Sequence, residues 1–238
     1  MEVQDLEQIV RQREGALSTA FPALMRKVYV WMALALVITG VCAFGVASSP
    51  HLLTALYSSR AAIWVLLIAE LGLVFYTTAR IDKLSLSTAT TLFVIYSALN
   101  GVTLSSIFLV YTMTSITEVF FISAGTFGAM ALYGYVTKTN LAKIGNILFM
   151  GLIGIIIAGI ANMFFRSTMM DLVVSGIGVL VFVGLTAYDS QKIKQMLLMQ
   201  EDMGETAQKV ALMGALSLYL DFINLFLYLL RIFGKNNN

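Results

Sequence analysis

Five ionisable side chains fall inside or at the ends of long apolar stretches, where a charge is costly and marks a candidate site. Glu70 and Asp221 lie near the middle of such stretches, Asp189 and Arg80 each close one, and Arg231 ends the last. Carboxylates in a medium of low dielectric can hold protons, and their oxygens are the ligands that calcium prefers. The chemistry open to these residues is the binding of protons and hard cations.

Asp189 and Asp221 are the pair best suited to this chemistry. Two carboxylates close together in an apolar medium resist joint ionisation and can share one proton. Calcium usually takes about six to eight oxygen ligands, so two carboxylates with water would bind it weakly, which suits passage more than storage. Counting along a helix places Asp221 about 15 Å from the start of its stretch, whereas Asp189 closes its own. The spacing leaves open whether the two carboxylates touch.

A purely structural role is the alternative for these groups. Each carboxylate could pair with an arginine and lock two helices together, and Arg80 and Arg231 could be anchors that reach the membrane surface. Tyr96, Asn100 and Thr103 form a polar stripe at helical spacing. Such a stripe could line a pore, but we expect interhelical hydrogen bonds, a common use of polar side chains in membrane helices.

Motifs typical of enzymes and metal sites are absent from the sequence. No HExxH, Walker A loop, GxSxG or CxxC pair occurs. His51 is the only histidine, so no histidine cluster can hold a metal, and the single cysteine, Cys42, cannot form an intrachain disulfide. We therefore expect no enzyme, no resident cofactor and no nucleic-acid partner.

The elements that must position the candidate residues are membrane-spanning helices. Hydrophobic residues make up 59% of the chain and charged residues 12%, whereas soluble domains contain about half and about a quarter. A helix needs roughly 20 apolar residues to cross the hydrocarbon core, while barrel strands would be half as long and would alternate. Seven stretches meet this requirement: Val28–Ala47, Ala61–Ala79, Ala89–Tyr111, Val119–Val136, Ile144–Phe165, Leu172–Tyr188 and Ala211–Leu230.

We therefore predict an all-α polytopic protein that crosses the bilayer seven times. Residues 1–27 carry four basic and four acidic side chains and lack the apolar core of a signal peptide, so they are predicted to form a cytoplasmic N-terminal tail. Residues 28–234 are predicted to be the transmembrane domain, and residues 235–238 a C-terminal tail. The lipid bilayer is the first expected partner.

Basic residues are concentrated on one predicted side of the membrane. If the last stretch crosses, eleven lie there: Arg11, Arg13, Arg26, Lys27, Arg80, Lys83, Lys138, Lys143, Lys192, Lys194 and Lys209. The other side then has Arg60, Arg166, Arg231 and Lys235. The positive-inside rule puts the larger group, and with it the N-terminus, in the cytoplasm. A re-entrant last stretch would move Arg231 and Lys235 to the cytoplasmic side, but its length favours a full crossing.

Three segments together carry a family resemblance. They are Tyr96–Tyr111 (YSALNGVTLSSIFLVY), Gly184–Lys194 (GLTAYDSQKIK) and Ala215–Gly234 (ALSLYLDFINLFLYLLRIFG). They strongly resemble the Bax inhibitor-1 family, also called the transmembrane Bax inhibitor motif family, and within it the bacterial branch. The resemblance extends from Arg26 to Gly234, and its most specific parts are the two segments that contain the aspartates.

The resemblance implies a seven-helix bundle with the last helix at its centre, a calcium leak that responds to pH, and a place in the bacterial inner membrane. It implies that an aspartate pair on the sixth and seventh spans senses pH and handles the cation; Asp189 and Asp221 match those positions. An arginine on the second span is thought to latch this pair, and Arg80 is the candidate. Glu70 and Arg231 resemble a second polar pair that joins the second and last helices.

Two alternatives to an autonomous channel remain open. Some bacterial relatives bind and modulate a membrane-bound AAA protease, and the N-terminal tail, rich in Glu and Gln, could serve such binding. Intramembrane aspartyl proteases also place two aspartates on consecutive spans, and Tyr188 with Asp189 matches their Tyr-Asp pair. Their second aspartate belongs to a GxGD motif, however, whereas Asp221 follows the sequence Leu-Tyr-Leu.

Overall fold

The computed structural model describes residues 3–200 and 202–237, with residues 3–19 and Arg60 described by their backbone alone. The described chain is built from helices, with an isolated β-bridge between Tyr111 and Asn236. The helices are α1 (Val3–Ala47), α2 (Pro50–Tyr57), α3 (Arg60–Arg80), α4 (Leu86–Leu104), α5 (Ile107–Val110), α6 (Met113–Val136), α7 (Ala142–Phe165), α8 (Thr168–Leu198) and α9 (Glu205–Phe233).

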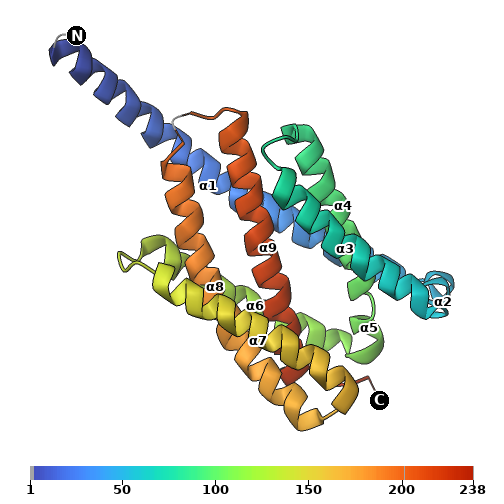
Figure 1. Cartoon of the computed structure of the whole chain (residues 1–238). Coiled ribbons are helices and arrows are strands. Elements are labelled where there is room, and N and C mark those ends of the chain that lie inside the picture. Colours follow the sequence, from blue (N-terminus) through green and yellow to red (C-terminus); the bar gives the residue numbers. More distant parts are fainter. Residues whose placement is uncertain (1–2, 201, 238) are drawn as a thin grey trace.

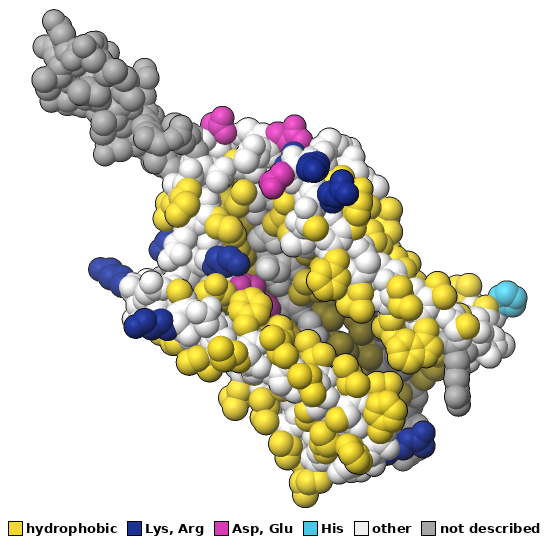
Figure 2. Space-filling view, viewed as in Figure 1, with side chains coloured by type: hydrophobic (Ala, Val, Ile, Leu, Met, Phe, Trp, Pro, Cys, Tyr) yellow, Lys and Arg dark blue, Asp and Glu magenta, His cyan; other side chains and the backbone are white. Residues whose placement is uncertain are grey.

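Seven segments of these helices are long and apolar enough to cross a membrane, and each contains or closely matches one predicted stretch. The all-α class and the seven spans are confirmed. α8 continues ten residues beyond its predicted stretch, to Leu198, and α9 begins six residues before its own, at Glu205. Apolar side chains cover the middle of the face shown in Figure 2, and most charged side chains gather towards its edges.

The first span lies in α1 and begins at Ala20. The backbone of α1 is helical from Val3 onwards and continues through Pro22 without a break. The predicted boundary between residues 27 and 28 therefore does not coincide with the end of a helix.

The last helix is the centre of the bundle (Figure 1). Of the span in α9, 67% is buried, whereas no other span is more than 33% buried. α9 packs against α8, α1, α6 and α4, while α3 lies at the edge and packs mainly against α4. The prediction of a central last helix is confirmed.

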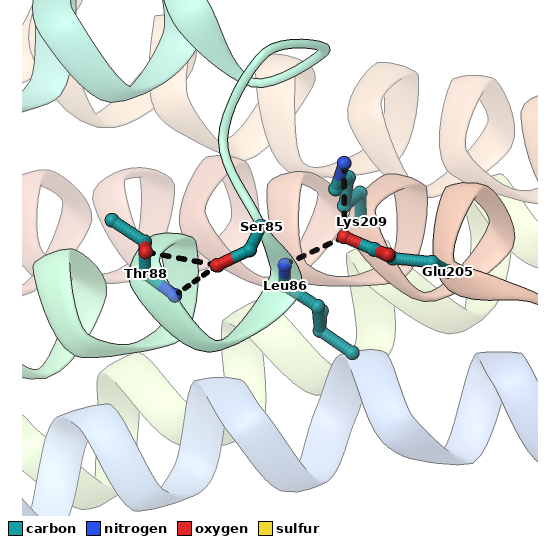
Figure 3. Close-up of polar contacts among 5 residues, drawn as sticks. All are labelled: Ser85, Leu86, Thr88, Glu205 and Lys209. Carbon is teal, nitrogen blue, oxygen red and sulfur yellow. Dashed lines mark hydrogen bonds and ion pairs between the residues drawn. The ribbon is translucent and has the colours of Figure 1, made fainter.

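Polar side chains fasten one end of α9 to the start of α4 (Figure 3). Ser85 caps α4 by accepting a hydrogen bond from the backbone N–H of Thr88. Glu205 Oε1 accepts a hydrogen bond of 2.9 Å from the backbone N–H of Leu86 and lies 3.2 Å from the Nζ atom of Lys209. The loop between α3 and α4 is thereby tied to the first turn of the central helix.

The other end of α9 lies beside the loop between α5 and α6. The backbone N–H of Thr112 donates to the Lys235 carbonyl at 3.0 Å, and that of Asn237 donates to the Val110 carbonyl at 2.8 Å. The loop between α5 and α6 follows the third span, whereas the loop between α3 and α4 precedes that span. The two ends of α9 therefore lie on opposite sides of the bundle. The last predicted stretch is thus an unbroken helix that crosses the bundle, not a re-entrant loop.

Candidate functional site

The register between α8 and α9 decides how Asp189 and Asp221 lie relative to each other. Gly214 faces the side chain of Ile193, and Gly178 faces the ring of Tyr228. In two antiparallel helices these contacts place Asp189 level with residue 218 and Asp221 three residues further along, about 4 to 5 Å deeper.

Both carboxyl groups line the same open cavity of about 310 Å³, whose walls are formed by α7, α8 and α9. Figure 2 shows acidic side chains at the edge of a hollow in the middle of this face. Asp189 and Asp221 therefore face one space, which the spacing alone could not decide. The difference in depth between the two aspartates is smaller than the residue count suggested, because α8 and α9 both extend well beyond the predicted stretches.

Asp221 is the more deeply enclosed of the two carboxylates. It is 5% exposed, against 9% for Asp189. The Oδ2 atom of Asp221 is buried and has no hydrogen-bond partner among the residues that the structure describes. A buried carboxylate oxygen without a partner is costly unless the group is protonated or bound to a cation. Asp221 is thus suited to exchange a bound proton for a bound cation.

Two further polar residues of α9 belong to this cavity and were missed in the sequence. Ser217 and Asn224 line it, and the Ser217 hydroxyl lies close to Asp189. The Asn224 amide nitrogen donates to the Leu220 carbonyl at 2.8 Å, so its amide oxygen is the group that it can offer to an ion. Ser217 is four residues before Asp221 and Asn224 is three residues after it, so all three lie on one face of the helix. This spacing could have identified them from the sequence.

The donor set fits a weakly held, partly hydrated calcium ion. It comprises two carboxylates, one hydroxyl and one amide oxygen. All of their oxygens would have to bind to reach even the lower end of the roughly six to eight ligands of a dedicated calcium site. Among the described residues, no group of three or more His, Cys, Asp or Glu side chains could hold a metal. Water would have to supply the remaining ligands.

Arg80 does not latch the aspartate pair in this structure. Its side chain is exposed at the end of α3, and α3 packs against α2 and α4 at the edge of the bundle. The prediction assumed that Asp189 closes its membrane span and therefore lies at the depth of Arg80. In fact α8 continues nine residues beyond Asp189 to Leu198, about 14 Å of helix, so the two residues lie at different depths. Lys192, one turn from Asp189, is the cation whose charge acts on that carboxylate.

The predicted pair of Glu70 and Arg231 is also wrong for this structure. Arg231 Nη1 lies 3.2 Å from Asp171 Oδ1, which joins the end of α9 to the first turn of α8. Glu70 is in the middle of α3, a helix that packs on α4. Hydropathy does not say which helices are neighbours, whereas the antiparallel arrangement of α8 and α9 places Asp171 beside Arg231.

Glu70 instead anchors a chain of hydrogen bonds through the bundle. It is 7% exposed, and the Thr103 hydroxyl donates to its Oε1 atom, while the Asn100 amide lies 3.4 Å from Oε2. Tyr219 OH donates to the Asn100 oxygen at 3.2 Å and lies 2.7 Å from the Thr39 hydroxyl. The chain joins α3, α4, α9 and α1. The prediction that the stripe on α4 serves interhelical hydrogen bonds is confirmed for Asn100 and Thr103.

The fold and the site together define a polytopic α-helical membrane protein with two buried carboxylates on its last two helices. A family model described as "Inhibitor of apoptosis-promoting Bax1" matches residues 22–238. The chain belongs to this family, the Bax inhibitor-1 family, as the three sequence segments indicated.

The chain is also similar to bacterial proteins over most of its length. The Inner membrane protein YbhL of Escherichia coli (strain K12) is 49% identical over 231 residues, 96% of each chain. A protein of Borreliella burgdorferi is 46% identical over 214 residues, 90% of this chain and 92% of the relative. A membrane protein of Streptococcus pyogenes serotype M1 is 45% identical over 170 residues, 71% of this chain and 73% of the relative. The chain is a multi-pass membrane protein, and the likeness to YbhL supports the inner membrane as its location.

Proposed function

We propose that the chain is a pH-sensitive calcium leak channel in which Asp189 and Asp221 form the ion-binding and pH-sensing site. The observation that carries the proposal is the buried, unpartnered Oδ2 atom of Asp221 in the cavity that Asp189 also lines. The family resemblance points to the same pair, and the N-terminus is predicted to lie in the cytoplasm.

Protons and calcium compete for the pair in this mechanism. When the two carboxyl groups share a proton, the cavity carries less negative charge and binds a cation weakly. When that proton leaves, the cavity gains a charge that only a cation can neutralise in this apolar surrounding. Calcium binding therefore weakens as the pH falls. The small number of protein oxygens keeps the ion hydrated and lets it leave.

Calcium entry into liposomes tests the proposal. The purified chain is reconstituted with an indicator dye inside, and calcium is added outside at several values from about pH 6 to about pH 8. We expect entry above that of empty liposomes, with a rate that changes with pH. Equal entry into protein-containing and empty liposomes at every pH would refute the proposal.

The effect of Arg80 in the same assay follows from its position. We expect Arg80→Ala to leave calcium flux and its pH profile unchanged within about twofold, because an exposed side chain away from the cavity contributes little. Lys192→Gln serves as the comparison, since it removes a positive charge that acts on Asp189, and we expect it to shift the pH profile. A displaced profile for Arg80→Ala would mean that the latch forms in another conformation of the protein.

The two other functions remain predictions with less support. Binding of a membrane AAA protease was inferred from the N-terminal tail, and the side chains of residues 1–19 lie outside the described part of the chain. An intramembrane aspartyl protease would also need two aspartates facing one space, but the GxGD motif of such enzymes is missing around Asp221.

A further inference from the structure

A long apolar groove separates α1 from α6 on the side of the bundle that is predicted to be cytoplasmic. It has a volume of about 570 Å³ and is lined by one face of α1 from Pro22 to Leu36 and by α6 from Phe127 to Tyr135. Both helices pack against α8 and α9, and the space between them is open except at one end, where the rings of Phe21 and Tyr135 stack with their centroids 6.3 Å apart. The groove lies within two membrane spans, so its surroundings are lipid.

The two ends of the groove differ in polarity. Because α1 and α6 run in opposite directions, Arg26 and Tyr135 lie at one end, and Leu36 and Phe127 at the other. Lys194 adds a second positive charge at the polar end, since its Nζ atom donates to the Tyr135 carbonyl at 2.8 Å and lies 5.0 Å from the centre of that ring. The groove thus has an apolar body and a basic mouth.

We propose that this groove binds an anionic glycerophospholipid, with one acyl chain between α1 and α6 and the phosphate at Arg26. The charge at the mouth is complementary to a phosphate, and the cytoplasmic leaflet is where anionic lipids and basic pockets between helices meet. The apolar length below it suits a chain of methylene groups. This inference does not depend on the calcium proposal.

The dimensions of the groove favour an acyl chain over a helix of a partner protein. A helix is about 10 Å across and rises about 5.4 Å per turn, so one turn alone fills roughly 400 Å³. From Pro22 to Leu36 the groove is about four helical turns long, and that length of helix would need roughly 1600 Å³, so the groove is too narrow to enclose a helix. A single extended hydrocarbon chain fits along its length.

Gly128 provides a way to close the groove without disturbing the fold. It lines the groove, and a Cβ atom added there meets nothing within 4 Å. Gly125 is equally open, lies on the same helix and does not line the groove. Gly128→Leu is therefore the blocking variant and Gly125→Leu its matched control. Arg26→Gln changes only an exposed charge and tests the mouth separately.

The experiment measures lipid binding to the purified, delipidated full chain by native mass spectrometry. Phosphatidylglycerol and phosphatidylcholine with the same acyl chains are compared. We expect the wild type to prefer phosphatidylglycerol and Arg26→Gln to reduce that preference about fivefold, as the loss of one basic residue near an anionic headgroup predicts. Gly128→Leu should lower the occupancy by both lipids at least about tenfold, and Gly125→Leu should leave it unchanged.

Several outcomes would overturn the proposal. Wild-type levels of phosphatidylglycerol on a folded Gly128→Leu variant would mean that the lipid binds elsewhere. Equal binding of the two lipids by the wild type would remove the role of Arg26. A thermal stabilisation by inorganic phosphate equal to that by phosphatidylglycerol would indicate a site for the free anion, and loss of a bound polypeptide from Gly128→Leu would indicate a partner helix. If Gly128→Leu does not fold, the proposal is still tested by whether Arg26→Gln loses the preference for phosphatidylglycerol over phosphatidylcholine.

Discussion

We expect either Asp189→Asn or Asp221→Asn to abolish the pH dependence of calcium flux, and we expect the double substitution to add little to either change. The two carboxyl groups line one cavity, and the helix register places them about 4 to 5 Å apart in depth. Two carboxyl groups that face one apolar space resist joint ionisation, so their titration belongs to the pair and not to either residue. Removing one carboxylate removes the shared proton and half of the charge that attracts calcium.

The measurement is calcium flux as a function of pH for the wild type, the two single variants and the double variant. We expect each single variant to lose about tenfold in flux where the pair is ionised, with coupling in the range of roughly 0.5–3 kcal/mol that contacting residues show. Asp171→Asn is the control, because it removes an exposed carboxylate from the same helix α8. Additive effects, with part of the pH response kept by each single variant, would show that the aspartates act separately.

The seven spans could be predicted from the sequence because the thickness of the hydrocarbon core imposes a length on every crossing helix. Helices in lipid must satisfy their own backbone, so a long apolar stretch has few other folds available. The ends of the helices were predicted less well. The polar residues from Ser190 onwards were interpreted as a cytoplasmic helical extension outside the span, whereas the candidate span in α8 includes them as far as Leu198. That difference moved Asp189 away from the helix end and removed the reason for a contact with Arg80.

The partners of the buried charges could not be predicted in the same way. Glu70 was expected to meet Arg231, whereas it bonds to Thr103 and Asn100 on the neighbouring helix α4. Hydropathy reports how apolar a helix is, but not which helices are neighbours or which faces they turn to each other. The aspartate pair was found because two specific segments of sequence point to it, and no comparable segment marks α3.

The last prediction concerns Gly134, where α6 and α8 approach each other closely near the site. A Cβ atom added at Gly134 on α6 would meet the backbone carbonyl of Ala187 on α8, two residues before Asp189. The same two helices are joined by a hydrogen bond of 2.7 Å from the Ser190 hydroxyl to the Ala131 carbonyl. Because backbone atoms cannot rotate away as a side chain can, Gly134→Ala must push α6 and α8 apart.

We expect Gly134→Ala to destabilise the protein by roughly 1–3 kcal/mol, the usual cost of overpacking a close contact. For a chain of this size that corresponds to a loss of about 2–4 °C in the thermal midpoint per kcal/mol. Thermal unfolding in detergent measures this, and the pH dependence of flux reports whether Asp189 has moved. Gly128→Ala on the same helix is the control, since the added methyl group meets nothing within 4 Å and should leave the midpoint unchanged or slightly higher. Equal midpoints for the two variants would mean that α6 and α8 are not in backbone contact, and the position of Asp189 would then depend on α9 alone.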